Sequence, residues 1–181
     1  MSITKFAVLL PISSRTSEQE LQRSMNEIAK YCFKAQTSTV KCQIYFGIDS
    51  GDEVLDCDAG RDLLQAPFHN LDISTLVVSC SESEGAICRI WNTLALTAYD
   101  DGCEFIVLLG DDVVVHTQNW MTEIITTFEA LHQRLSSLPF GFGIVCMNDL
   151  SFPGFPTFPV VHRTHIDIMG EMFPKDFINQ V

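Results

Sequence analysis

Short apolar runs alternate with amphipathic stretches along most of the chain. Four apolar runs have the length expected of buried strands: 6–12, 43–48, 75–80 and 104–109. Three stretches carry apolar side chains at helical spacing: 17–32, 85–99 and 119–135. In the first of them, Ser17 and Glu20 have the spacing of a capping box, which predicts where that helix begins. A further strand is expected at 142–147.

The order of these elements predicts an α/β fold with a parallel or mostly parallel sheet covered by helices on both faces. The 181 residues suit one domain, and no repeat or linker divides them. The polar segment 53–70 is expected to be a loop with a short helix, and 151–161 has no clear period.

The charge balance limits the possible partners. Eleven Lys and Arg residues against 23 Asp and Glu residues give a net charge of −12. This excess argues against a nucleic-acid partner and against binding to anionic lipid, because both require clustered basic side chains. A phosphorylated ligand would need a cation between itself and the protein.

The seven cysteines form no C-x-x-C pair and are odd in number, so buried thiols in a reducing compartment are expected. No apolar run approaches the roughly 20 residues of a membrane span. These features predict a cytoplasmic protein, or a soluble domain of a longer one.

The strongest chemical signal is the acidic turn, Gly110-Asp111-Asp112, which follows an entirely apolar strand. Ligands of open α/β sheets bind beyond the C-terminal ends of the strands, where this turn is expected. Two adjacent carboxylates repel one another unless a cation lies beside them, and Mg²⁺ or Mn²⁺ prefers such oxygen ligands. The alternative is that both aspartates only cap a turn.

Two other strand ends carry polar residues. Asp49 follows the second strand and can accept a hydrogen bond from a nucleobase ring N–H, or it can close an Asx turn. Gly85 opens a helix whose N-terminus can receive an anion, and Arg89 lies one turn further on. Arg89 is equally well explained as a surface residue.

Taken in order, these segments resemble the GT-A-fold glycosyltransferases of the family-two-like kind. The resemblance implies nucleotide contacts from the loop after the first strand, from the second strand end and from the third helix. The implied nucleotide-binding residues are Pro11, Ser13, Arg15, Asp49, Gly85, Arg89 and Asp111. The family's acidic signature is Asp-x-Asp, whereas this chain has Gly-Asp-Asp.

The resemblance also implies a Mn²⁺ or Mg²⁺ ion held by Asp112, with Asp111 contacting it or the ribose. His162, or else His165, could complete the metal shell. The run 154–159 resembles an acceptor loop, and is either a platform for a sugar or a packed loop. The resemblance implies that a helix follows this loop and ends at Gly170. Residues 1–115 then form a nucleotide-binding half and 116–181 an acceptor-side half.

An inverting sugar transfer also needs a carboxylate base. Asp149 and Asp176 are the candidates, with Glu171 behind them. In the family this acid follows the position of Gly170, close to where the sequence stops, so a truncated chain or an inactive relative is also consistent.

The leading hypothesis is a glycosyltransferase that uses a UDP-, GDP- or dTDP-sugar and a glycan or glycoprotein acceptor. The alternative is a catalytically incomplete nucleotide-binding or scaffold protein on the same fold. A nucleotidyltransferase is disfavoured because the loop after the first strand is not glycine-rich. A dinucleotide-dependent dehydrogenase is disfavoured because no G-x-G-x-x-G follows that strand.

Overall fold

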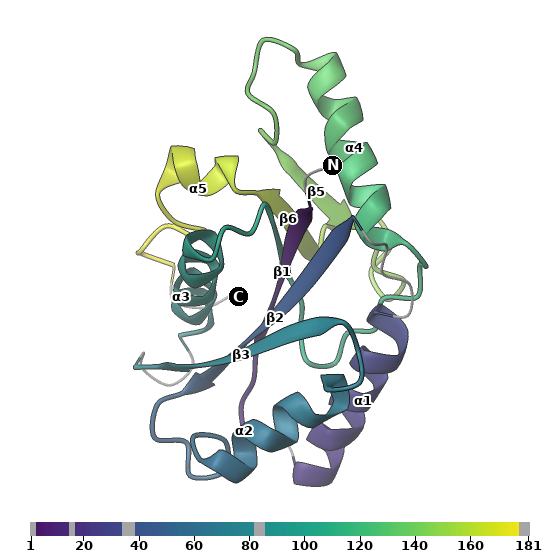
Figure 1. Ribbon diagram of the computed structural model, residues 1–181. Helices are drawn as coiled ribbons and strands as arrows, with labels where there is room; N and C mark the ends of the chain where they lie inside the picture. Colours follow the sequence, from purple (N-terminus) through teal and green to yellow (C-terminus); the bar gives the residue numbers. More distant parts are fainter. Residues whose placement is uncertain (1–2, 15–16, 34–38, 82–85, 178–181) are drawn as a thin grey trace.

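The computed structural model describes residues 3–14, 17–33, 39–81 and 86–177 (Figure 1). Its elements, in chain order, are β1 (Thr4–Pro11), α1 (Glu18–Cys32), β2 (Val40–Asp49), α2 (Asp58–Gln65), the 3₁₀ helix η1 (Ala66–Phe68), β3 (Ile73–Cys80), α3 (Ile87–Asp100), β4 (Phe105–Leu108), α4 (Trp120–Arg134), β5 (Ile144–Met147), β6 (Phe158–His162) and α5 (Thr164–Met169). Each strand apart from β6 was expected from the sequence to within a few residues, and so were α1, α3 and α4. A short helix was expected somewhere within 53–70, where α2 lies, and α5 ends just before Gly170 as expected; η1 was not expected.

The six strands form one sheet in the order β3-β2-β1-β4-β6-β5. The first four are parallel, whereas β6 is antiparallel to both β4 and β5. Two reversals restore the direction, so β5 points the same way as β4. The chain is thus a single α/β domain with a mostly parallel sheet, which confirms the prediction.

β1 lies at the centre of the sheet, and its residues from Phe6 to Leu10 have no exposed surface. Phe6, Val8 and Leu10 pack in one core cluster with residues of α1, α2 and α4. Ala7 and Leu9 pack in a second cluster with residues of α3 and α5. The sheet is therefore covered on both faces, as Figure 1 shows, and this explains why its central strand is apolar at every position.

The start of α1 has the predicted capping box. The backbone N–H of Glu20 donates to the Ser17 hydroxyl at 3.3 Å, and the Ser17 N–H donates back to the Glu20 carboxylate at 3.2 Å. The apolar positions expected to face the core are all buried: Leu21, Met25, Ile28, Ala29 and Cys32. Local sequence alone determines where this helix starts and which face it buries.

β6 was not expected, because Pro159 lies within it and the surrounding segment shows no alternation. The ladder between β4 and β6 covers only Val160 to His162, so Pro159 is paired with β5 alone. A proline that lacks a neighbouring strand on one side removes little from the sheet. The strand can therefore contain a proline although it lies inside the sheet.

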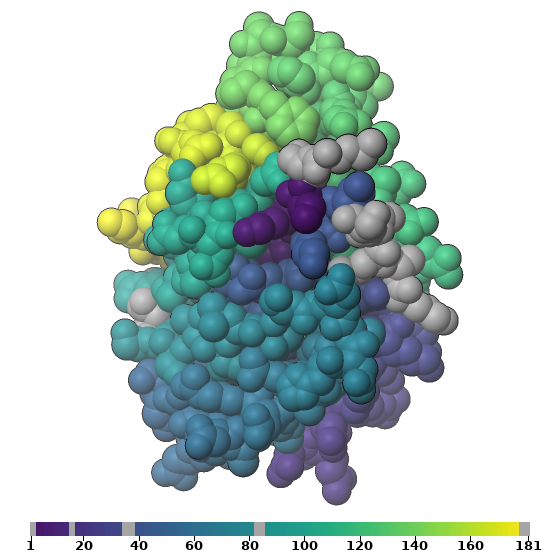
Figure 2. Space-filling model, in the orientation of Figure 1, coloured from purple at the N-terminus to yellow at the C-terminus, as the bar shows by residue number. Residues whose placement is uncertain are grey.

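The end of α4 and the chain leading to β5 project beyond the rest of the molecule, near the start of β1 (Figures 1 and 2). Within the described ranges, no helix has both the length and the hydropathy needed to cross a bilayer. All seven cysteines are free thiols; five are buried, whereas Cys57 and Cys146 are exposed.

Candidate functional site

The C-terminal ends of β1, β2 and β4 meet at one edge of the sheet. Pro11 ends β1 in register with Gly47, and the next backbone N–H, of Ile12, donates to the Gly47 carbonyl at 2.7 Å. On the other side of β1, the Leu109 N–H donates to the Leu9 carbonyl at 3.1 Å. The loop after β1 and the acidic turn after β4 therefore begin beside each other, as the topology rule requires.

Asp49 is half-buried at the end of β2, where it pairs with Cys80 at the end of β3. The Ser50 N–H donates to the Cys80 carbonyl at 2.8 Å and continues the ladder by one bond. This position sets Asp49 on the same edge as Pro11. Its role in reading a nucleobase stays a prediction.

Asp52 joins the loop after β1 to the loop after β2. Its carboxylate accepts hydrogen bonds from the backbone N–H groups of Ser14 at 3.4 Å, Val54 at 2.9 Å and Leu55 at 3.0 Å. Burial on its own would raise the pKa of Asp52, but hydrogen bonds from Leu55, Ser14 and Val54 outweigh it and hold that pKa below its usual value. Asp52 is ionised at neutral pH and positions both loops.

A second carboxylate, Asp56, ties the same region to α2 and β3. It accepts hydrogen bonds from the Gly51 N–H at 3.0 Å, the Ser79 hydroxyl at 2.7 Å and the Arg61 guanidinium at 2.6 Å. These bonds, with that from Gly51 the largest cause, lower the pKa of Asp56 to about 2. Sequence reasoning missed the roles of both residues: Asp52 read only as part of the acidic stretch that closes the second strand, and Asp56 fell in the polar segment 53–70.

The acidic turn directly follows β4, a strand whose four residues are all buried. The Val113 N–H donates to the Gly110 carbonyl at 3.2 Å and closes the turn. Asp111 is half-buried, and its burial, followed by the negative charge of Asp112, raises its pKa. The two acids therefore lie close enough to repel each other at the edge of the sheet.

Gly110 has a steric role in this turn. A methyl group at Gly110 would lie 2.7 Å from a carboxylate oxygen of Asp112, which folds back over the glycine. Glycine at this position therefore allows the Asp112 side chain to remain above the turn.

The chain after the turn is anchored to the end of α1. The Val115 N–H donates to the Cys32 thiol at 3.2 Å, and the Trp120 indole N–H donates to the Cys32 carbonyl at 2.6 Å. The same indole packs edge-on against Phe6, with ring centroids 6.0 Å apart. Buried hydrogen bonds thus hold the segment that follows the two acids.

The remaining predicted nucleotide-binding residues are only partly placed. Ser13 is half-buried in the loop after β1, and Arg89 is exposed in the first turn of α3, the helix that follows β3. Arg15 and Gly85 lie outside the described residues. Contacts of these residues with a nucleotide stay predictions.

The prediction that His162 completes a metal shell is wrong. His162 pairs with Phe105, which begins β4, whereas the acidic turn follows its end. Extended chain from Phe105 to Leu109 separates the two by about 13 Å. The imidazole is buried against the rings of Phe105, Phe128 and Phe140, and it hydrogen-bonds the Thr164 hydroxyl at 2.9 Å.

Burial lowers the pKa of His162, so it is a neutral core histidine at physiological pH. His165 lies on α5, the helix that continues from β6 at the same end of the sheet, and its ring contacts the Met172 carbonyl at 3.3 Å. Neither histidine lies at the strand ends that carry the acidic turn.

Of the two carboxylates predicted as catalytic base, Asp149 lies at the C-terminal edge of the sheet, just after β5. It accepts hydrogen bonds from the N–H groups of Ser151 at 2.8 Å and Phe152 at 3.3 Å. A hydrogen bond from Thr157 is the largest cause that lowers the pKa of Asp149, followed by the bond from Ser151. A lowered pKa makes this carboxylate a weak proton acceptor.

Asp176, the other predicted base, is exposed near the end of the described chain. It follows Phe173, whose backbone N–H donates to the Asn92 side chain at 2.7 Å and whose ring packs on Trp91. This segment therefore runs along α3. Its role as a base stays a prediction.

The only side-chain donors that the acidic turn offers to a metal ion are carboxylate oxygens. Within the described parts of the chain, no group of three His, Cys, Asp or Glu side chains is arranged to hold a metal. A Mg²⁺ or Mn²⁺ ion held by one or two carboxylates takes its other ligands from phosphate and water. The donor set therefore fits such an ion when a phosphorylated ligand is also present.

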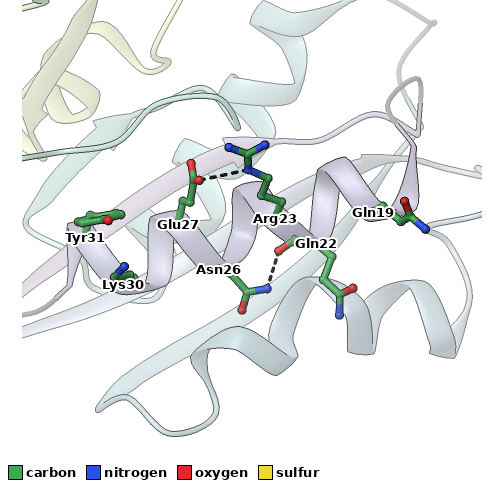
Figure 3. A pocket seen from close by; sticks show the side chains of 7 residues that line it. All are labelled: Gln19, Gln22, Arg23, Asn26, Glu27, Lys30 and Tyr31. Atoms are coloured by element: carbon green, nitrogen blue, oxygen red, sulfur yellow. Dashed lines mark hydrogen bonds and ion pairs between the residues drawn. The ribbon is translucent and has the colours of Figure 1, made fainter.

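An open hollow of about 410 Å³ lies over the outer face of α1 (Figure 3). All the lining side chains come from that helix, and they are polar or charged apart from the aromatic ring of Tyr31. Arg23 pairs with Glu27 at 3.3 Å, and the Asn26 amide donates to the Gln22 carbonyl at 2.8 Å. This hollow is a feature of the solvated helix surface and shares no residue with the strand ends described above.

Comparison with known proteins shows the fold alone. No known protein family matches the sequence, and no curated protein matches it either. A solved structure that matches is the apo form of mouse xyloside xylosyltransferase 1, with a TM-score of 0.50 and 8% sequence identity. The match covers 91% of this chain and 68% of that one. The chain thus has the fold of a glycosyltransferase structure.

Proposed function

We propose that this protein is a metal-dependent glycosyltransferase that moves a sugar from a nucleoside-diphosphate sugar to an acceptor hydroxyl with inversion. The observation that carries the proposal is the acidic turn, which follows a buried parallel strand at the edge where β1 and β2 also end. The fold shared with a xylosyltransferase structure supports the same class. That similarity does not select the sugar or the acceptor.

The electrostatics of the acidic turn favour a cation. Burial and the neighbouring Asp112 disfavour the ionised form of Asp111, as its raised pKa records. No Lys or Arg of the described segments forms an ion pair with either acid. A divalent cation would relieve this repulsion and, when bound, would neutralise charge that develops on the leaving diphosphate. In this proposal Asp112, the exposed acid, is the direct ligand.

The loops after β1 and β2 would hold the nucleotide. Pro11 and Ser13 lie on the first loop and Asp49 ends the strand beside it. The hydrogen bond from Ser14 to Asp52 fixes the two loops relative to each other before a ligand binds. Such preorganisation lowers the entropic cost of binding.

Asp149 and Asp176 are the two candidates for the base that receives the acceptor proton. Asp149 lies at the correct edge, but its hydrogen bonds to the backbone weaken it as a base. This observation favours the second candidate function, a nucleotide-binding protein that is catalytically incomplete. The two functions differ in turnover and not in nucleotide binding.

Calorimetric titration of UDP, GDP and dTDP, with MnCl₂ and with EDTA, tests the proposal. We expect one nucleotide to bind with Mn²⁺ and its affinity to fall at least about tenfold with EDTA or in Asp112→Asn, the size typical of a lost charged contact. Asp100→Asn is the matched control, since Asp100 also belongs to a pair of adjacent aspartates, but it ends α3 before β4 begins. This control should bind like the wild type.

Turnover is then measured with the sugar forms of the nucleotide that binds. Release of free sugar or transfer to an acceptor supports the glycosyltransferase, whereas metal-dependent binding without turnover supports the incomplete protein. Flat titrations for all three nucleotides, or binding that is unchanged by EDTA and by Asp112→Asn, would contradict both.

A further inference from the structure

The connection between β5 and β6, residues 148–157, exposes an unusual amount of apolar surface, and we call it the aromatic loop. Leu150 is 76% exposed, and Phe152 and Phe155 are each 65% exposed. Among the large apolar side chains of the described residues, these three are the most exposed. Exposed apolar groups that gather in one place usually mark a contact surface.

The aromatic loop is held in shape by its own hydrogen bonds. Asp149 accepts from Ser151 and Phe152, the Phe155 N–H donates to the Phe152 carbonyl at 3.1 Å, and the Thr157 N–H donates to the Phe155 carbonyl at 3.0 Å. These bonds keep both phenylalanine side chains on the outside of a closed turn. The apolar groups are therefore presented to solvent although the loop is ordered internally.

The aromatic loop lies at the same edge of the sheet as the acidic turn. β5 runs in the direction of β4, so its end and the start of β6 both lie beside the end of β4. Val113, directly after the acidic turn, and Phe158, directly after the aromatic loop, pack against the same core cluster. The loop therefore borders the candidate site from the side opposite β2 and β3.

The charge distribution identifies the kind of molecule that this surface suits. Residues 150–161 include no charged side chain, in a protein with a net charge of −12. An anionic molecule would be repelled by the neighbouring carboxylates and would find no basic group on the loop. An uncharged molecule with an apolar face would bury apolar area against Phe152 and Phe155, and no charged group would have to be desolvated.

We propose that the aromatic loop binds the apolar face of an uncharged glycoside acceptor and holds its hydroxyl at the acidic turn. This inference rests on the proposed function, because it names the acceptor class of that same site. The ring C–H groups of a neutral sugar, or an aromatic aglycone attached to it, pack on the phenylalanine rings. A free carboxylate or sulfate on the acceptor opposes binding.

The test uses the double variant Phe152→Ser/Phe155→Ser, with Ile168→Ser as control. Ile168 is 53% exposed on α5, which follows the end of β6 that pairs with the start of β4. Saturation-transfer NMR with 4-nitrophenyl β-xyloside, β-glucoside and β-glucuronide measures acceptor binding without a donor. We expect the neutral glycosides to bind the wild type and the control, and to bind the double variant about tenfold more weakly, as when two contact aromatics are truncated.

The inference would be overturned if the wild type bound the glucuronide as tightly as the neutral glycosides. It would also be overturned if the double variant bound all three glycosides as tightly as the wild type does. A third result would also overturn it: the wild type binds no glycoside but sediments with neutral phosphatidylcholine vesicles, and the double variant does not. A lipid surface would then be the partner. The Mn²⁺-dependent titration of UDP, GDP and dTDP is repeated on the double variant and should be unchanged. A failure of glycoside binding with intact nucleotide binding rejects this inference alone, and the reverse pattern rejects the proposed function alone.

Discussion

The backbone N–H of Ser14 donates a 3.4 Å hydrogen bond to the carboxylate of Asp52, and so links the loop after β1 to the loop after β2. The two residues are 38 positions apart in the sequence. Their strands are neighbours in register, so the contact needs no displacement of either loop. A single side chain therefore sets the spacing of two segments proposed to hold one nucleotide.

Replacing Asp52 should weaken both stability and nucleotide binding. Asp52→Ala leaves three backbone N–H groups without their acceptor, and we expect about 1 kcal/mol less unfolding free energy because the region is partly solvated. Asp52→Asn keeps one acceptor oxygen and should recover most of the loss. Urea denaturation and nucleotide titration measure the two effects, and equal behaviour of Asp52→Ala and the wild type in both would contradict this role.

The pH dependence of Asp52 provides a second readout. Its pKa lies below the ordinary value, so the stabilisation is complete above the unfolded-state pKa of about 4 and is lost as pH falls through the lower folded value. The stability difference between wild type and Asp52→Ala should therefore shrink below about pH 4.

Asp111→Asn should stabilise the metal-free protein. The pKa of Asp111 is raised, so its ionised form costs stability when pH exceeds that pKa, and the cost disappears as pH falls through it. We expect Tm to rise by about 2 °C at pH 7 and to equal that of the wild type at low pH, where Asp111 is itself neutral. Thermal melts in EDTA measure this difference, and a lower Tm for the variant at pH 7 would show that the ionised acid stabilises the fold.

Gly141 and Gly154 have similar φ angles, so replacing each by alanine separates the cost of backbone strain from the cost of steric overlap. Gly154 has φ of +85° with nothing within 4 Å of an added methyl group, so Gly154→Ala should cost about 1–2 kcal/mol from backbone strain alone. Gly141 has φ of +80°, but a methyl group there would overlap the His162 ring. Gly141→Ala should therefore lower the free energy of unfolding by roughly 1–3 kcal/mol more than Gly154→Ala does, because of overpacking. Chemical denaturation measures both losses. If the two variants lost the same free energy of unfolding, the His162 ring would have to move aside freely.

The fold was largely predictable because its main signals are local. The apolar run of β1 and the capping box and buried positions of α1 were read from neighbouring residues, and the order of strands and helices indicated a parallel sheet. β6 was missed for an equally local reason, since Pro159 obscured it. Its place between β4 and β5 depends on long-range pairing that no short window contains.

The candidate site was predictable only where a strand end determines position. Asp49, Asp111 and Asp112 lie at the expected edge because Asp49 ends one parallel strand and the two other acids lie in the turn after another. His162 was misassigned because the antiparallel direction of β6 carries it to the other end of the sheet. The partners of Asp52 and Asp56 could not be foreseen, since they depend on how three loops meet.

Because β6 runs antiparallel to β5, the connection between these two strands can vary in length without changing the sheet. Residues 148–157 leave the sheet on β5 and return to it on β6, so the antiparallel pairing of these two strands closes the loop whatever its length. Doubling such a loop adds only about 0.6 kcal/mol of closure entropy. The segment can therefore be exchanged or enlarged at little cost, while the strands that carry Asp49 and the acidic turn stay as they are.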